Sequence, residues 1–265
     1  MKIYLSADIE GTTGIASWEE TSEGHVLYEY FVGQMTREVA AACEGAIAAG
    51  AGEILVKDAH GCARNIKPDL LPEQVKIFRG WGKNPLMMMA GIDQSFDGVV
   101  FTGYHSAAGM NTNPLAHTMN NKNNYVKING ETMSELMMNS LTAAYFGVPV
   151  FFVAGDEGLC AWIQSVNANI TTIPVNIGFG DGAISIHPAL AVKRIRSAVE
   201  EALKKPKMDC MFPLPKDFSV EISYKQHQLA THASNYPGCK LTGTTSVTYE
   251  TDDYMDVLRM LYWVL

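Results

Sequence analysis

Acidic and imidazole side chains follow three separate apolar runs of this sequence. The runs end in Asp8-Ile9-Glu10-Gly11, in Asp58-Ala59-His60-Gly61 and in Gly103-Tyr104-His105-Ser106. Side chains two residues apart on a strand face the same side, so Asp8 and Glu10 should point together. Ligands of open α/β sheets gather outside the carboxyl ends of the strands. We therefore expect these ends to bring together four side chains: Asp8, Glu10, His60 and His105.

This mixture of side chains predicts metal chemistry. Zinc accepts both imidazole nitrogen and carboxylate oxygen as ligands. Several carboxylates among few ligands also favour a two-metal cluster, because one carboxylate can bridge a pair of ions. A single histidine or aspartate at a strand end is more often a cap or a hydrogen-bonded polar group. The same pattern at three strand ends instead favours a metal site, and with it a metal-dependent hydrolase.

Two further residues are candidates whose roles the residue types leave open. Glu135 lies early in a predicted helix after the turn dipeptide Asn129-Gly130. The helix dipole alone accounts for a carboxylate there, so a ligand role needs other support. His117 lies in a predicted loop, where it suits a general acid, base or nucleophile. A solvated turn residue is the equally good alternative.

These side chains need alternating strands and helices to position them. Residues 3–9 and 53–57 read as strands on either side of a helical pattern from about 25 to 49, which is a βαβ unit with parallel strands. Further strands are expected near 75–78, 99–103, 125–128, 149–154 and 170–176, with helices near 85–90 and 131–146. We predict an α/β fold with a mainly parallel sheet flanked by helices.

The C-terminal part does not continue the regular alternation of strands and helices. An amphipathic helix is expected over 189–204, followed by a Pro-rich connection over 206–215. Strands near 219–224 and 240–249 and a terminal helix from about 252 complete the chain. We predict a metal-binding catalytic α/β domain over 1–185 and a smaller α+β domain over 186–265.

Composition narrows the class of protein. Of the 265 residues, 47% are hydrophobic and the formal net charge is −8, so the chain is globular and lacks the basic footprint of a nucleic-acid-binding protein. No apolar run is long enough to span a membrane. The first residues do not form a signal peptide, and the five cysteines show no C-x-x-C pair. We expect a cytoplasmic protein with free thiols.

The ordered set of motifs resembles the zinc-dependent D-aminopeptidases of the DppA type. The motifs are Ser6–Gly11, Asp58–His60, Gly103–His105, His117, Asn129–Gly130 and Ser134–Leu136, followed by Val153–Asp156 and Thr242–Thr245. Together they cover nearly the whole chain. The ordered set is more specific than any single motif.

This resemblance implies two zinc ions per subunit, with Asp8 bridging them and Glu10, His60, His105 and Glu135 as the other ligands. His117 matches the histidine proposed as the family's catalytic nucleophile. The resemblance also implies release of N-terminal D-amino acids from short peptides, with D-alanine peptides as typical substrates. It implies a ring-shaped homo-oligomer, a decamer of two pentamers. Residues 107–113 and 120–124 are where we expect departures from relatives.

Two alternatives remain open on the residues themselves. Another dinuclear hydrolase, an amidase or a phosphoesterase, would use the same ligands. A phosphoesterase would add cationic side chains near the cleft, and Lys57 and Arg64 flank the second strand end. A non-catalytic small-molecule binding protein would use the same crevice. The three consecutive methionines Met87–Met89 are expected to fill the core, with an adaptable pocket wall as the alternative.

Overall fold

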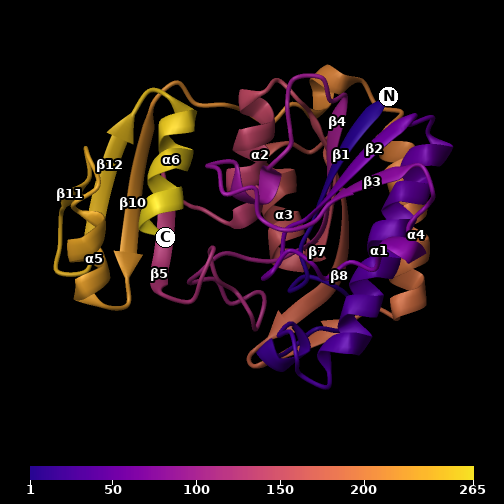
Figure 1. The fold of residues 1–265 in the computed structure, drawn as a ribbon, viewed down its shortest axis with the longest axis horizontal. Helices are drawn as coiled ribbons and strands as arrows, with labels where there is room; N and C mark the ends of the chain where they lie inside the picture. Colours follow the sequence, from indigo (N-terminus) through magenta and orange to yellow (C-terminus); the bar gives the residue numbers. More distant parts are fainter.

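The computed structural model covers residues 1–265 and contains two sheets (Figure 1). The larger sheet has seven strands in the order β3-β2-β1-β4-β7-β8-β9, and the smaller has five in the order β11-β12-β10-β5-β6. The larger sheet comprises β1 (Lys2–Ala7), β2 (Glu53–Asp58), β3 (Val75–Phe78), β4 (Gly98–Tyr104), β7 (Val150–Asp156), β8 (Thr171–Phe179) and β9 (Gly182–Ser185). All of its strands pair in parallel except β9, which runs antiparallel to β8. The predicted α/β class with a mainly parallel sheet is confirmed.

Helices cover both faces of the larger sheet. They are α1 (Tyr28–Ala48) and α4 (Pro188–Ala202) on one face, and α2 (Glu135–Tyr145) and α3 (Glu157–Val166) on the other (Figure 1). The alternation along β1 divides the core: Ile3 and Leu5 pack with α1 and α4, whereas Tyr4 packs in the core that contains α2 and α3. None of the helices is both long and apolar enough to cross a membrane.

The smaller sheet is antiparallel and lies beyond α2. It comprises β5 (Asn123–Ile128), β6 (Glu131–Thr132), β10 (Phe218–Tyr224), β11 (Lys240–Leu241) and β12 (Ser246–Thr251), with α5 (His227–Ala233) and α6 (Tyr254–Val264) beside it. Helix α6 lies between this sheet and α2 (Figure 1), and the Tyr254 hydroxyl donates a 2.6 Å hydrogen bond to the Met138 carbonyl of α2. One apolar core therefore spans both sheets.

The two sheets do not divide at residue 185, where we expected a domain boundary. Strands β5 and β6 come before that position but pair in the smaller sheet through β10. Helix α4 comes after it but packs in the core of α1 and the larger sheet. The physical reason is non-local strand pairing, since the period of an isolated strand does not reveal its partner.

Several elements differ from the predictions in type or extent. Residues 87–89 form only a 3-10 turn, η3 (Met87–Met89), and the expected strand over 240–249 is two short antiparallel strands joined by a turn. Three more 3-10 turns are η1 (Trp18–Glu20), η2 (Pro68–Leu70) and η4 (Lys207–Cys210). Helix α3 was not predicted. Its start is marked by Asp156, whose side chain accepts a hydrogen bond from the Leu159 amide as an N-cap.

Candidate metal centre

Three strand ends deliver side chains to one buried place. Asp8 follows β1, His60 lies two residues past β2, and His105 directly follows β4. Because β1 lies between β2 and β4 in the sheet, their carboxyl ends are neighbours. The predicted convergence of these residues with Glu10 is confirmed, and Asp8, Glu10 and His105 are almost fully buried.

Asp8 lies between two imidazoles. Its Oδ1 is 3.4 Å from His60 Nδ1, and its Oδ2 is 3.5 Å from His105 Nε2. Glu10 Oε2 is also 3.1 Å from His60 Nδ1. The two oxygens of one carboxylate thus face different histidines, one from each neighbouring strand.

Glu135 and His117 join this cluster from outside the parallel strands. Glu135 is the first residue of α2, and its Oε2 is 3.5 Å from His105 Nε2. Its Oε1 is 3.5 Å from His117 Nε2 and accepts a 2.6 Å hydrogen bond from the Met119 amide. The rings of His105 and His117 are stacked, with centroids 4.2 Å apart. All six predicted site residues therefore lie together.

Each histidine uses one ring nitrogen on a backbone carbonyl. His60 Nε2 lies 2.9 Å from the Thr21 carbonyl oxygen, His105 Nδ1 lies 2.9 Å from the Ser106 oxygen, and His117 Nδ1 lies 2.9 Å from the Leu115 oxygen. A carbonyl only accepts, so each of these nitrogens carries the proton. The opposite nitrogen of each ring faces the carboxylates and, once it has lost its proton, offers a lone pair to a metal, as in histidines that bind one.

Several polar atoms at the centre of the cluster lack a hydrogen-bond partner. They are Asp8 Oδ2, Glu10 Oε2 and His105 Nε2, all buried. Buried polar atoms in proteins are normally satisfied, and unpaired ones are expensive. A cation between these atoms would satisfy all three. The donor set of carboxylate oxygen and imidazole nitrogen is the one that zinc accepts, so the residues fit a zinc site.

The electrostatics of the cluster reflect carboxylates crowded in a buried place. Burial raises the pKa of Asp8 well above its usual value, and the Glu10 charge raises it further. Burial acts in the same direction on Glu10 and Glu135, but the nearby imidazoles outweigh it: they hold the pKa of Glu10 well below its usual value and lower that of Glu135 to about 2. Burial acts to lower the pKa of His105, yet the surrounding carboxylates raise it to about 10. The pocket therefore attracts positive charge.

A buried polar network holds the loop that carries His117. Asp156, at the end of β7, accepts hydrogen bonds from the Ser106 amide and hydroxyl, both at 2.6 Å, and from Asn113 Nδ2 at 3.2 Å. Asn113 Nδ2 also lies 3.4 Å from the Glu10 carbonyl oxygen. In the sequence, Asp156 is only the last residue of the Val153–Asp156 motif. In the structure it ties His105's neighbour to the 106–118 loop.

Asp58, the acidic residue two positions before His60, does not enter the site. Its carboxylate accepts hydrogen bonds from the Asn65 amide and side chain and from the Ile66 amide. It shapes the loop after β2. Cys62 belongs to no cluster of metal-ligand type.

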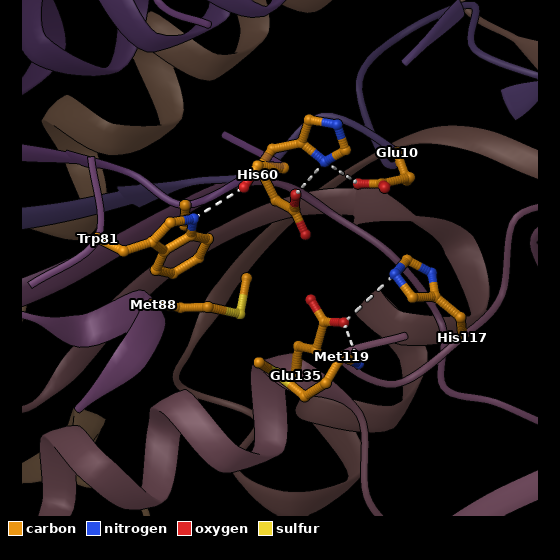
Figure 2. A pocket seen from close by; sticks show the side chains of 10 residues that line it. Glu10, His60, Trp81, Met88, His117, Met119 and Glu135 are labelled. Atoms are coloured by element: carbon orange, nitrogen blue, oxygen red, sulfur yellow. Dashed lines mark hydrogen bonds and ion pairs between the residues drawn. The ribbon is translucent and has the colours of Figure 1, made fainter. Parts of the chain in front are cut away.

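The cluster lines one side of a pocket of about 200 Å³. Figure 2 shows Glu10, His60, His117 and Glu135 around this pocket, with Trp81 and Met88 on another side. Ala59 and Met119 add further apolar surface. Trp81 and Met119 had not been predicted as site residues, because no local pattern distinguishes them from other loop side chains.

Comparisons with known proteins place the chain among peptidases. A family model described as peptidase family M55, D-aminopeptidase, matches residues 1–263. The chain is 29% identical over 264 residues to a D-aminopeptidase of Bacillus subtilis (strain 168), covering 98% of this chain and 95% of that protein. A solved structure, the Zn-dependent D-aminopeptidase DppA from Bacillus subtilis, described as a self-compartmentalizing protease, superposes with a TM-score of 0.92 at 28% identity. That match covers 100% of this chain and 96% of the other.

Proposed function

The chain belongs to the M55 family of D-aminopeptidases, and from that premise we propose that it releases N-terminal D-amino acids of the D-alanine type from short peptides. As a member of this family it is a metal-dependent aminopeptidase. The observation that carries the proposal is the buried cluster of three carboxylates and three imidazoles with unpartnered atoms at its centre. Both relatives named above are D-aminopeptidases.

We propose that five residues would hold two zinc ions: Asp8 would bridge them, and Glu10, His60, His105 and Glu135 would complete the ligand set. The bridging role of Asp8 is supported by its two oxygens, which face His60 and His105 separately. Bound zinc would polarise the peptide carbonyl and lower the pKa of a bound water. The protein's part is to hold these side chains in place, through the backbone carbonyls that fix each imidazole.

His117 is the proton carrier in this proposal. Its Nδ1 is fixed by the Leu115 carbonyl, which leaves Nε2 facing Glu135 and the pocket. Nε2 can take a proton from the attacking water and pass it to the leaving amine. Direct attack by His117 on the carbonyl is the competing role, and the same variant tests both.

The test pairs activity with metal content. Zinc-loaded protein is assayed on D-alanyl and L-alanyl dipeptides, and we expect hydrolysis of the D-peptide to dominate. His117→Ala should keep its zinc and lose about 10²–10⁴-fold in kcat. The exposed His232 supplies the matched control, His232→Ala, which should retain full activity. Full zinc content with unimpaired turnover in His117→Ala would remove His117 from the reaction.

The phosphoesterase alternative depended on a cationic side chain beside the pocket. No lysine or arginine lines the pocket. Lys57 is buried with its ammonium on the Asp58 and Gly80 carbonyls, and Arg64 is exposed outside the pocket. A generic phosphate ester, assayed beside the peptides, should not be hydrolysed. A non-catalytic binding protein would bind zinc and peptide without turnover.

We also propose that the chain forms a homo-oligomer, with the ring-shaped decamer as its specific form. The structural relative is described as self-compartmentalizing. Large apolar side chains are exposed on the segment before α1 and on the β8–β9 hairpin: Val26 at 83%, Phe179 at 78% and Ile184 at 61%. Such a surface suits a contact with another subunit. Light scattering should give a mass near ten chains, and a monomer would contradict the proposal. A cytoplasmic location stays a prediction from the sequence.

A further inference from the structure

The pocket has an apolar side that the metal chemistry does not use. It is formed by Trp81, Met88 and Met119, together with Ala59. Figure 2 shows Trp81 and Met88 side by side, away from His117. A substrate held by the cluster would place a side chain against this surface. An apolar wall of this kind suits an apolar side chain.

Two interactions fix the position of the Trp81 side chain. It lies after β3 in a segment without a helix or strand, and 39% of its surface is exposed. One anchor is its indole Nε1, which donates a 2.8 Å hydrogen bond to the Gly61 carbonyl (Figure 2). Gly61 directly follows His60, so this bond joins Trp81 to the strand end that delivers a candidate ligand.

The second anchor is Lys57, which is fully buried and forms no ion pair. Its ammonium donates hydrogen bonds to the carbonyls of Asp58 and Gly80, the latter at 3.0 Å. It also lies 4.6 Å from the centre of the Trp81 ring and 5.1 Å from that of Phe78. A buried lysine without a direct salt bridge is unusual and unfavourable unless its surroundings compensate, and here the nearby Asp58 charge opposes only part of the effect of burial on its pKa.

The groups around the buried Lys57 ammonium indicate its structural role. Two carbonyl oxygens and two aromatic faces surround its charge, and these groups come from β2 and from residues 78–81. A cation over an aromatic face is attracted by the ring electrons. The ammonium therefore joins the Gly80-Trp81 backbone and the Trp81 ring to the end of β2. Burial lowers the pKa of Lys57 to about 8, so the ammonium is mostly charged at neutral pH.

We propose that Trp81 is the specificity-determining residue of this pocket and that Lys57 is the residue that positions it. The indole contacts the side chain beside the scissile bond and, in a pocket of about 200 Å³, restricts that side chain to a small apolar one. The inference rests on the proposed peptidase function and refines its substrate class. Lys57 acts only through Trp81.

The test uses two series of D-dipeptides on the zinc-loaded, full-length protein. One series varies the first residue through Ala, Val, Leu and Phe before a constant D-alanine, and the other varies the second residue in the same way. Trp81→Ala should raise kcat/KM for the leucine peptide relative to the alanine peptide at least tenfold in one series. That series identifies which residue the indole contacts. Trp81→Phe, which keeps a ring, should give a smaller shift.

Lys57→Met tests the positioning role with an apolar side chain of similar length. It should shift the leucine-to-alanine ratio in the same direction as Trp81→Ala but by less, with zinc content unchanged. Trp263→Ala is the matched control, because Trp263 is 68% exposed on α6 and lies outside the pocket. It should leave every ratio at the wild-type value.

The outcomes distinguish a failure of the roles of Trp81 and Lys57 from a failure of the proposed peptidase function. If the wild-type protein cleaves peptides but Trp81→Ala and Trp81→Phe change all of them by the same factor, Trp81 does not determine specificity and the proposal is wrong. If Lys57→Met keeps the wild-type ratios, the positioning role of Lys57 is wrong. If the zinc-loaded wild-type protein cleaves no peptide of either series, the proposed function fails and takes this inference with it.

Discussion

Replacement of Asp156 by asparagine tests whether one buried carboxylate holds the loop of the metal centre in place. Asp156 accepts hydrogen bonds at its two oxygens from the Ser106 amide and hydroxyl, from Asn113 and from the Leu159 amide. Asparagine keeps the shape but turns one acceptor into a donor. In either orientation of the amide, at least one buried backbone N–H then faces another N–H.

The magnitude follows from these bonds. One buried donor left without an acceptor costs about 1–3 kcal/mol, and the remaining bonds lose the contribution of the negative charge. We expect Asp156→Asn to lose about 3 kcal/mol of unfolding free energy. For a chain of this size each kcal/mol corresponds to about 2–4 °C in Tm, so the shift should be about 6–12 °C. Activity should fall as well, because Ser106 follows His105 and Asn113 is in the loop of His117.

Asp253→Asn is the matched control for this experiment. Asp253 is the N-cap of α6 and accepts a hydrogen bond from the Met255 amide, as Asp156 does from Leu159 at α3. Asparagine caps a helix about as well as aspartate, so this control should change Tm by only about 1–2 °C. The measurement is thermal unfolding by circular dichroism on zinc-loaded protein. Equal shifts in the two variants would refute the reasoning, since capping alone would then explain Asp156.

Three further outcomes are expected. Asp8→Asn should lower zinc per chain by mass spectrometry and reduce hydrolysis at least about 100-fold, and an unchanged zinc content would contradict the bridging role. Gly103→Ala should destabilise the protein more than Gly130→Ala. Both glycines have positive φ, but a Cβ at 103 would lie 2.1 Å from the Asp8 carbonyl oxygen, whereas a Cβ at 130 would contact nothing. Equal denaturation midpoints of the two variants would show that the chain relaxes around residue 103. Zinc binding at pH 7 should release at least one proton in calorimetry with two buffers, because the pKa of His105 is raised to about 10 and the metal needs the neutral ring. Because the folded protein raises the pKa of His105, protonated His105 stabilises the metal-free protein. This stabilisation is complete below about pH 6.5 and is lost as the pH rises through about 10.

Local sequence patterns were enough to predict the mainly parallel sheet and the edge of it that carries the site residues. Ile3 and Leu5 lie on one face of β1, because side chains alternate along a strand. Asp8 and Glu10, which were expected to point together, directly follow β1, and both lie beside His60. Parallel strands also end at the same edge, so His60 and His105 could be expected beside Asp8. These predictions need no knowledge of distant contacts.

Other features depended on contacts that no local pattern encodes. The partner of β5 is β10, 90 residues and more further along the chain, so the sequence alone divided the chain at the wrong place between the two sheets. Lys57 was considered as a cation near the cleft because it flanks the second strand end, yet it is buried beside Trp81. Asp156 had no assigned role in the sequence, yet it holds a loop in place through Asn113.

Asp8 and Glu10 show where the division lies. The sequence by itself determined that two carboxylates, two residues apart, directly follow the apolar strand β1, since the apolar pattern of a strand is a local property of the chain. Only the tertiary structure decided that Asp8 presents each oxygen to a different imidazole and that Glu135 approaches from α2. Those distances depend on the order of strands in the sheet and on the packing of a helix against it, which the whole chain sets at once.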